Sequence, residues 1–422
     1  MMAAISAADK NPGARIVIIE KNSEPGKKLG STGNGKCNLS NSACPGHAFV
    51  LHRFLDLGLF TITDSSGRIY PYSEDAKDVV RILLCAIEKR GIHVCCHTTV
   101  TRIRKTGDFF DVQLSQRHCL DRKNNAESPN TKSTAYQGSV KSGKNRHQTY
   151  SAEYTNTTFL TAKTVLIAAG GKAAPQFGTA GEGTKLAKSL GHSVSRLAPA
   201  LTAIKTKENL ASIAGVRAKC RISLYRTHSD NAGSCEEIAT EAGEIQFTRY
   251  GVSGICVFNL SRHMKISQGK TLKNGFDDYE ARIDFLPGIG DVPKLLSKLK
   301  QLPPSASTAL SVLTSLPTLT SLVKKPLADY IHLHSNGDLT KLVSMLKEFR
   351  LHPQGLMGWD FAQVTAGGVL YDEIDKQTMQ SRLVKGLFFA GEVLDYDGPC
   401  GGYNLQHAWE SGIRAGEHLL SD

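Results

Sequence analysis

The first 198 residues alternate between short apolar runs and amphipathic stretches. β-Branched runs at residues 14–21, 93–105 and 164–171 predict strands, and residues 74–90 and 183–190 carry apolar side chains at helical spacing. Strands that alternate with helices in this way are typical of an α/β domain. We therefore expect the chain to begin with such a domain.

The pattern changes after residue 198 and changes back after residue 354. Residues 199–290 contain short β-like runs separated by turns (RISLY, GEIQF, GICVFNL and ARIDF), which predict a small β-barrel or sandwich. Residues 291–354 repeat Leu and Lys at helical spacing and predict a helical subdomain. Because the α/β pattern returns over residues 355–422, we expect 1–198 and 355–422 to form one domain, with the other two parts inserted.

Composition and the cysteine pattern narrow the class of protein. Of the 422 residues, 40% are hydrophobic and 21% are charged, which is an ordinary globular balance. No apolar run approaches the roughly 18 residues of a membrane-spanning helix, and the first residues lack the features of a signal peptide. The ten Cys include no C-x-x-C pair, which disfavours a zinc ribbon and a thioredoxin-type redox pair. These features predict a cytoplasmic protein with reduced thiols and no membrane partner.

One histidine spacing bears on metal binding. His93 and His97 form the H-x-x-x-H pattern, but they lie in strand-like sequence, where four residues span roughly 13 Å. Two ligands of one zinc ion must lie much closer together. We therefore expect no metal site.

The net charge of +12 is partly local. Residues 115–153 contain seven Lys or Arg and three Asp or Glu, and they are rich in polar side chains. A segment of this composition cannot bury enough apolar surface to become ordered, so we expect a disordered insertion that is dispensable for folding. An RNA-binding arm is the alternative, although only Tyr136 and Tyr150 lie among the charges, which is little for stacking on bases.

The stretch GSTGNGKC, residues 30–37, is close to a P-loop. A P-loop needs a strand before it and a helix after it, but EPGKKL precedes this stretch and the turn-rich NLSNSACPG follows it. Cys37 would also be a poor ligand for Mg²⁺, which prefers oxygen. We therefore reject the P-loop. The small residues of this loop, flanked by lysines, are instead suited to approaching a phosphate or a flat ring with backbone N–H groups.

Glu20 ends the predicted strand at residues 14–21. In a dinucleotide-binding fold, an acid at the end of the second strand binds a ribose hydroxyl about 20 residues after a G-x-G-x-x-G fingerprint. Residues 1–10 carry apolar side chains on one helical face, so the chain starts in what would be the first helix of such a fold. The preceding strand and the fingerprint are expected just before Met1 and are not part of this sequence.

Two glycine-rich turns follow buried strands. Gly170 and Gly171 end the strand at 164–171, and ligands of open α/β sheets bind at the carboxyl ends of strands. Residues 401–404 open the final helix, whose free N–H groups favour partial negative charge. A reduced flavin carries such charge near its N1 and O2 atoms.

Six segments, spread over nearly the whole chain, together resemble the BaiN/RdsA-type family of NAD(P)/FAD-dependent oxidoreductases, also described as aminoacetone-oxidase-like FAD-binding enzymes. The segments are EKNSEPGKKLGSTGNGKCNLSN, GRIYPYS, VLIAAGGKAAPQFGTAGEGTKLAKSLGH, GEIQFTRYGVSG, FAQVTAGGV and GLFFAGEVLDYDGPCGGYNLQHAWESG. They keep the family's order, and they are highly specific as a set, whereas no single segment is.

The resemblance implies a glutathione-reductase-like (Rossmann-type) FAD-binding domain in two sequence pieces, with a β-barrel and a helical subdomain inserted between them. It implies an FAD-dependent oxidoreductase with NAD(P)H as electron donor and a small organic substrate. The cofactor-binding residues that it implies are Glu20, Lys21, Lys28, Gly33, Asn34, Gly35, Cys37, Asn38, Val100, Ala169, Gly170, Gly171, Gly391, Glu392, Asp395, Gly401, Gly402, Tyr403 and Asn404.

The chain departs from the family pattern in several places. Lys36 stands where Arg is common, and His407 stands where Trp is common. The insertion at 115–153 is unusual for the family. The absence of the first strand and the glycine fingerprint predicts weaker binding of the FAD pyrophosphate.

Three functions are compatible with these features: an FAD-dependent oxidoreductase, an FAD-fold protein that binds RNA or is associated with tRNA, and an inactive truncated product. The residues identify no catalytic acid or base. Arg68, Tyr70 and Tyr72 could face the substrate, although an exposed tyrosine cluster is as often a packing feature. Cys37 and Cys400 lie in cofactor-facing loops, but without C-x-x-C spacing we do not expect a redox pair.

Overall fold

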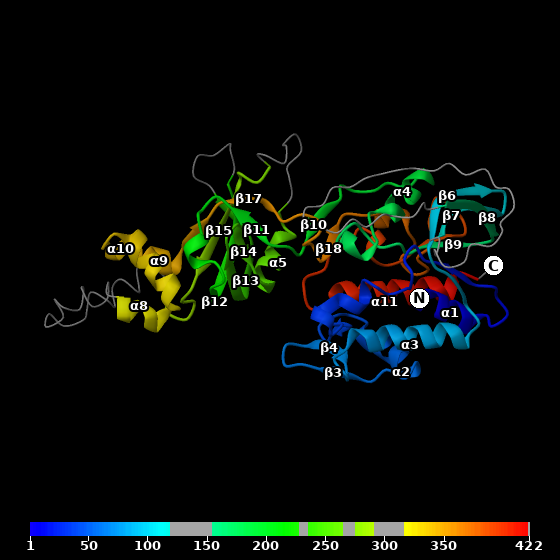
Figure 1. Cartoon of the computed structure of the whole chain (residues 1–422), viewed down its shortest axis with the longest axis horizontal. Coiled ribbons are helices and arrows are strands. Elements are labelled where there is room, and N and C mark those ends of the chain that lie inside the picture. Colours follow the sequence, from blue (N-terminus) through cyan, green and yellow to red (C-terminus); the bar gives the residue numbers. More distant parts are fainter. Residues whose placement is uncertain (119–153, 228–234, 265–274, 291–315, 421–422) are drawn as a thin grey trace, which may run out of the picture.

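The computed structural model describes residues 1–118, 154–227, 235–264, 275–290 and 316–420. Two lobes lie side by side (Figure 1). One lobe contains both ends of the chain, and the other contains the largest sheet and the helices α8 (Leu316–Leu322), α9 (Lys325–Ser335) and α10 (Leu339–Lys347), which lie between two of its strands in sequence.

The described helices agree with the predicted ones at residues 1–10, 74–90, 183–190 and at the end of the chain. They are α1 (Met2–Lys10), α2 (His47–Asp56), α3 (Ala76–Lys89), α4 (Glu182–Ser189), α5 (Ile255–Ser261), α8 (Leu316–Leu322), α9 (Lys325–Ser335), α10 (Leu339–Lys347) and α11 (Tyr403–His418). None of the described helices is long and apolar enough to cross a membrane.

The strands predicted at residues 14–21, 93–105 and 164–171 are also present. The described strands are β1 (Val17–Ile19), β2 (Ser40–Asn41), β3 (Thr61–Thr63), β4 (Arg68–Pro71), β5 (His93–Cys95), β6 (Thr98–Thr106), β7 (Phe109–His118), β8 (Tyr154–Ala162), β9 (Val165–Ile167), β10 (Ala198–Ala200), β11 (Ile204–Thr206), β12 (Arg217–Thr227), β13 (Cys235–Thr248), β14 (Gly251–Ser253), β15 (Tyr279–Asp284), β16 (Phe349–Leu351), β17 (Pro353–Leu356), β18 (Val364–Ala366) and β19 (Leu387–Phe389).

Parallel strand pairs characterise the lobe that contains the chain ends. β1 pairs with β5, and β9 pairs with β19, both in parallel. All three residues of β19 are buried. Parallel strands combined with helices confirm the α/β class of this lobe. The β9–β19 pair also places a strand from the end of the chain beside one from its first half.

An antiparallel sheet of β6, β7 and β8 flanks these strands. β7 and β8 pair up to the partners His118 and Tyr154. The predicted disordered insertion therefore begins too early, because residues 115–118 belong to β7 and extend its ladder. The rest of that prediction, residues 119–153, lies outside the described residues.

The second lobe contains a seven-stranded antiparallel sheet in the order β16-β15-β12-β13-β14-β11-β17. β16 and β17 lie at opposite edges of this order, although only His352 separates them in sequence. The sheet buries Phe247, Phe285 and Phe349 in one core, to which α9 contributes Leu327 and α10 contributes Leu346. The sheet and the helices therefore share a core.

Two predictions in this lobe are wrong. GICVFNL was expected to be a strand, but residues 255–261 form α5, with Cys256, Val257 and Leu260 buried. A short apolar run does not separate a strand from a buried helix, and these buried positions follow helical spacing. The predicted helical subdomain at 291–354 also extends too far, because Phe349 begins β16.

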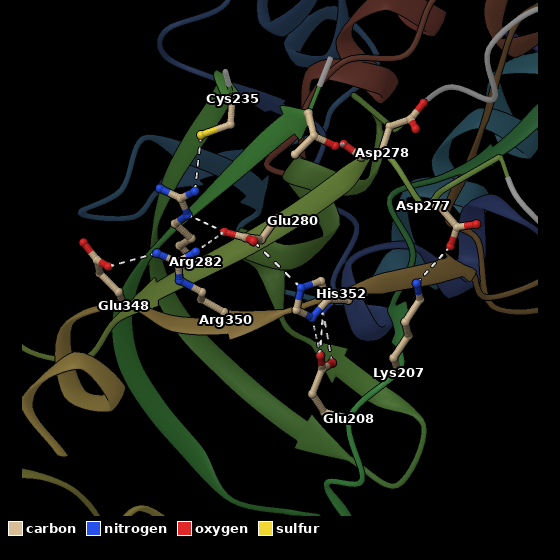
Figure 2. Close-up of polar contacts among 11 residues, drawn as sticks. Lys207, Glu208, Cys235, Asp277, Asp278, Glu280, Arg282, Glu348, Arg350 and His352 are labelled. Atoms are coloured by element: carbon tan, nitrogen blue, oxygen red, sulfur yellow. Dashed lines mark hydrogen bonds and ion pairs between the residues drawn. The ribbon is translucent and has the colours of Figure 1, made fainter. Parts of the chain in front are cut away.

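Figure 2 shows a polar network that joins β15, β16 and His352 to the segment that follows β11. Glu280 on β15 pairs with Arg282 at 2.5 Å and with Arg350 on β16 at 3.4 Å. His352 lies 2.7 Å from Glu208, which follows β11, and 3.8 Å from Glu280. These contacts tie β15 and β16 to the start of β17, and each partly exposed pair contributes modestly to stability.

Helices α1 and α11, from opposite ends of the chain, pack closely through glycines of α11. A Cβ atom added at Gly416 would lie 2.3 Å from the carbonyl oxygen of Ala3, which no real contact allows. A Cβ added at Gly412 would lie 3.7 Å from the amide nitrogen of Ala3, an ordinary contact. The close approach of the two helices therefore depends on Gly416.

We predict that Gly416→Ala destabilises the protein by about 1–3 kcal/mol, because α1 must move away from α11 to accommodate the methyl group. Gly412→Ala is the matched control, since Ala fits there and gains helix propensity of up to about 1 kcal/mol. Urea denaturation of both variants measures the difference. Equal stability of the two variants would contradict this packing.

Candidate functional site

A hydrogen-bonded network around Glu392 joins four separate segments. Its Oε2 atom pairs with Lys28 Nζ at 2.6 Å, and its Oε1 atom accepts the Thr365 N–H at 2.9 Å. The Thr365 hydroxyl accepts the N–H groups of Lys172 at 2.7 Å and of Ala173 at 2.9 Å. Lys28 Nζ also donates to the carbonyl oxygen of Ala173 at 3.2 Å. The predicted residues Lys28 and Glu392 therefore meet in the folded protein.

The turn after β9 packs directly against this network. A Cβ atom at Gly171 would lie 2.3 Å from Thr365 Oγ1 and 2.7 Å from Glu392 Oε1. Ala169 is exposed, and Gly170 is half-buried with a φ of 73°. The turn therefore presents its backbone beside the Glu392 carboxylate, and only glycine fits at position 171.

Glu20 lies at the carboxyl end of β1 and is half-buried. Its Oε1 atom accepts the Asn22 N–H at 2.7 Å, and Asn22 Nδ2 donates to the carbonyl oxygen of Phe177 at 3.0 Å. Lys21 pairs with Glu182 at the start of α4 at 2.5 Å. The second oxygen of Glu20 has no hydrogen-bond partner within the described ranges, so it can accept a hydroxyl.

The loop from Gly33 to Cys37 has an unusual backbone. Gly33, Asn34, Gly35 and Cys37 have φ values of 59°, 56°, 85° and 54°. Left-handed residues of this kind fold the loop tightly, and the N–H groups of Lys36 and Cys37 donate to the carbonyl oxygens of Gly33 and Thr32. In the described chain β2 follows this loop rather than a helix, which confirms that it is not a P-loop.

The start of α11 packs against the segment that follows this loop. Asn41 Nδ2 donates to the carbonyl oxygen of Gly401 at 2.9 Å. Gly402 has a φ of 102°, and a Cβ atom there would lie 2.3 Å from the carbonyl oxygen of Ser40 and 2.9 Å from Asn38 Oδ1. Asn38 Oδ1 is buried without a hydrogen-bond partner in the described part of the chain. Among the described residues no side chain caps α11. The N–H groups of its first turn therefore have no side-chain acceptor there, and the unsatisfied Asn38 Oδ1 lies close to Gly402.

The remaining predicted residues lie at the start of α11, in the segment before it, or in the apolar core. Asn404 holds the Gly398 backbone with two hydrogen bonds of 2.9 Å, and Tyr403 opens α11. The Gly391 N–H donates to Ser411 at 3.0 Å, and the half-buried Asp395 carboxylate has no partner among the residues described. Val100 packs against the apolar core of β9 and β19, which gives it a packing contact only.

These groups fit the FAD that the resemblance implies. A flavin edge needs donors and acceptors that the protein leaves unsatisfied, and the first turn of α11 and Asn38 Oδ1 provide them. The free oxygen of Glu20 suits a ribose hydroxyl. Glycine at position 171 lets the backbone pack against Thr365 and Glu392, and glycine at position 402 lets it pack against Ser40 and Asn38. These contacts hold the segments of the site together.

The two cysteines at this edge are chemically quiet. Burial raises the pKa of Cys37 to about 11, with a hydrogen bond from Thr32 opposing the shift. Burial also raises the pKa of Cys400 to about 12. Both thiols are therefore neutral near pH 7 and are poor nucleophiles. Among the described residues no group of three or more His, Cys, Asp or Glu gathers as a metal site would require.

Several functional contacts were missed by sequence reasoning, most clearly those of His407. Its ring stacks on Tyr396 at a centroid distance of 4.1 Å, and Nε2 hydrogen-bonds the Tyr371 hydroxyl. Burial lowers the pKa of His407 from its ordinary 6.5 to about 4, so Tyr371 donates to a neutral ring. The sequence identified His407 only as a departure from the family. Thr365 was missed too, because its partners lie far away in sequence.

Comparisons with known proteins identify the family of this chain. The family profile described as the HI0933-like protein Rossmann domain matches residues 119–418. The chain is 30% identical over 449 aligned positions to 3-dehydro-bile acid delta(4,6)-reductase of Clostridium scindens, covering 99% of this chain and 95% of that protein. It is 24% identical to ribosomal RNA dihydrouridine synthase of Escherichia coli, covering 99% and 94%. The solved structure of quinol fumarate reductase FrdA from E. coli aligns with a TM-score of 0.43 and 13% identity, covering 99% of this chain and 67% of that one.

We predict that His407 makes stability depend on pH. Because its pKa is lower in the folded than in the unfolded chain, its contribution is fully present above pH 6.5 and is lost as the pH falls towards 4. A shift of this size corresponds to at most about 3 kcal/mol. Urea denaturation at pH 7 and pH 4.5 should show a smaller change for His407→Phe than for the unmodified protein.

The exposed His52 provides the matched control, and His52→Phe should retain the full pH dependence. If His407→Phe and the unmodified protein lose the same free energy between the two pH values, His407 is not the buried neutral group described above.

Proposed function

This chain belongs to the HI0933-like Rossmann family, and we propose that it uses NADH or NADPH to reduce FAD and then reduces a small organic substrate. Its family and its reductase relative make it a flavin-dependent oxidoreductase with a Rossmann-type FAD-binding domain. The electron donor, the substrate class and the residues that hold the cofactor are the parts that we propose.

The gathering of separate segments around Glu392 and α11 carries the proposal. Three of the residues implied by the resemblance meet in the folded chain: Lys28 pairs with Glu392 at 2.6 Å, and Gly171 packs against the Glu392 carboxylate. We assign the ribose of the cofactor to Glu20 and its ring edge to Asn38 and the first turn of α11. When bound, FAD supplies hydride transfer, and the protein supplies binding, orientation and electrostatics.

The finer architecture is also a proposal. We assign residues 1–198 and 355–422 to one glutathione-reductase-like domain, which the β9–β19 pair supports. We assign the seven-stranded sheet to a closed barrel, because β16 and β17 are nearly continuous in sequence yet pair with opposite edges. The helices α8–α10 form its helical annex.

A second candidate is the reduction of a base in RNA. The relative from E. coli is named a ribosomal RNA dihydrouridine synthase, and the net charge of +12 would favour a polyanion. We prefer a small substrate, because the relative with the higher identity is named a bile acid reductase. Binding to RNA that weakens steeply with salt, together with reduction of uridine in that RNA, would favour the second candidate.

The direct test is anaerobic mixing of the flavin-loaded protein with NADH or NADPH in a stopped-flow spectrometer. We expect the flavin absorbance at about 450 nm to decrease with one of the two donors, because reduced flavin absorbs weakly at that wavelength. Bleaching with dithionite but with neither nicotinamide would exclude NAD(P)H as the donor.

We predict that Glu20→Ala weakens FAD binding by at least about tenfold, because the ribose loses a charge-assisted hydrogen bond worth about 1.5–3 kcal/mol. Glu88→Ala is the matched control, because Glu88 is exposed on α3 and its substitution removes the same charge. Fluorescence titration of FAD into each protein measures the affinity. Equal affinities for the two variants would show that Glu20 does not hold the cofactor.

A further inference from the structure

We propose that Arg68 binds an anionic group, a carboxylate or a phosphate, of the substrate at the loop formed by residues 396–402. Arg68 is thereby a specificity-determining residue that selects organic acids or phosphate esters over neutral compounds. This inference rests on the proposed function, because the loop opens onto the helix that we assign to the cofactor ring.

Residues 396–402 lie between the two lobes. From the second lobe, α5 contacts the loop with residues one helical turn apart. The Cys400 N–H donates to Asn259 Oδ1 at 2.8 Å, and Arg262 hydrogen-bonds the carbonyl oxygen of Asp397 while its Nε lies 3.6 Å from the Asp397 carboxylate. From the first lobe, Asn41 holds Gly401. Sites for small ligands occur preferentially where domains meet in this way.

Arg68 reaches the same loop from β4. Its Nε atom lies 4.0 Å from the position that a Cβ atom of Gly401 would occupy. The side chain is half-buried, and its guanidinium has no hydrogen bond or ion pair within the part of the chain that the structure describes. The backbone N–H of Arg68 is fixed by Asp64 at 3.0 Å, so the base of the side chain is held in place.

Arg68 is a cation near this loop that forms no ion pair within the described residues, although the Asp64 carboxylate interacts with its charge and the Glu241 carboxylate lies near Cys400. Arg262 is paired with Asp397, and the Glu241 carboxylate accepts a hydrogen bond from Asn259 at 3.1 Å. The neighbouring Cys400 thiol stays neutral, because burial raises its pKa more than Arg68 and Arg262 lower it. Partial burial of a guanidinium that has no hydrogen-bond or ion-pair partner costs free energy, because the group loses part of its hydration. A bound anion would offset this cost.

The shape of the guanidinium indicates the kind of anion. Its parallel N–H groups match two oxygens of one carboxylate or phosphate, whereas a neutral amide offers a single acceptor. The uncapped first turn of α11 begins at the adjacent Gly402 and favours negative charge in the same place. A substrate with its anionic group here would place its body beside the proposed cofactor ring.

Isothermal titration of the flavin-containing protein with benzoate, phenyl phosphate and benzamide tests the inference. Benzoate or phenyl phosphate should bind, and the one that binds more tightly identifies the group. Benzamide, which is the neutral counterpart of benzoate, should bind at least about tenfold more weakly. Arg68→Gln should reduce the affinity for the anion at least about tenfold and leave benzamide unchanged. Arg102→Gln removes the same charge from the exposed face of β6 and should have no effect.

Three results would overturn the inference: equal binding of benzoate and benzamide, unchanged anion binding in Arg68→Gln, or equal losses in Arg68→Gln and Arg102→Gln. Flavin absorbance of the same samples separates this failure from that of the proposed function. A protein that retains flavin but shows no role for Arg68 refutes only the anion site. Loss of flavin specifically from Arg68→Gln would assign the guanidinium to the cofactor and would also overturn the inference.

Discussion

The ion pair between Lys28 and Glu392 joins the two ends of the chain at the candidate site, and the other contacts there depend on it. Both side chains are partly buried, with exposed fractions of 28% and 19%, so each charge needs the other. The same carboxylate fixes Thr365, which in turn holds the turn at Lys172 and Ala173. Loss of this pair would release the turn after β9, the loop before β2 and the end of β19 together.

A second constraint is the close packing of α11 against α1 and against the Asn38–Ser40 segment. Gly416 lets α1 approach its C-terminal half, and Gly402 lets the Asn38–Ser40 backbone approach its first turn. Trp409, which lies between them, donates to the carbonyl oxygen of Leu39 at 3.1 Å and packs edge-on against Phe54. These contacts fix the direction in which the free N–H groups of α11 point, which is what a binding site for a flat ring requires.

Local sequence patterns were sufficient to predict some of this arrangement. The strand that ends in Glu20, the glycine pair at 170–171 and the helix that opens after Gly402 each follow from a short stretch. GICVFNL failed because a short, mostly apolar run is compatible with a strand or with a buried helix, and the packing of α5 against β13 is visible only in the fold.

Other contacts could not be predicted from the sequence, because they depend on residues that only the fold brings together. Thr365 acts through the backbone of residues almost 200 positions away, and nothing in FAQVTAGGV distinguishes its hydroxyl from that of any strand threonine. The fold buries His407 beside Tyr371 and Tyr396, and the sequence does not show that these side chains meet. Arg68 was a candidate from the sequence, but only the fold shows that its guanidinium forms no hydrogen bond or ion pair with the residues that the structure describes.

A crystal structure of the protein with FAD tests the central claim most directly, namely that these segments form the cofactor site. The account predicts a ribose hydroxyl within hydrogen-bond distance of Glu20 and a flavin ring edge at Asn38 and the first turn of α11, with the Lys28–Glu392 pair beside the cofactor. FAD bound elsewhere, or bound with these groups turned towards solvent, would contradict it.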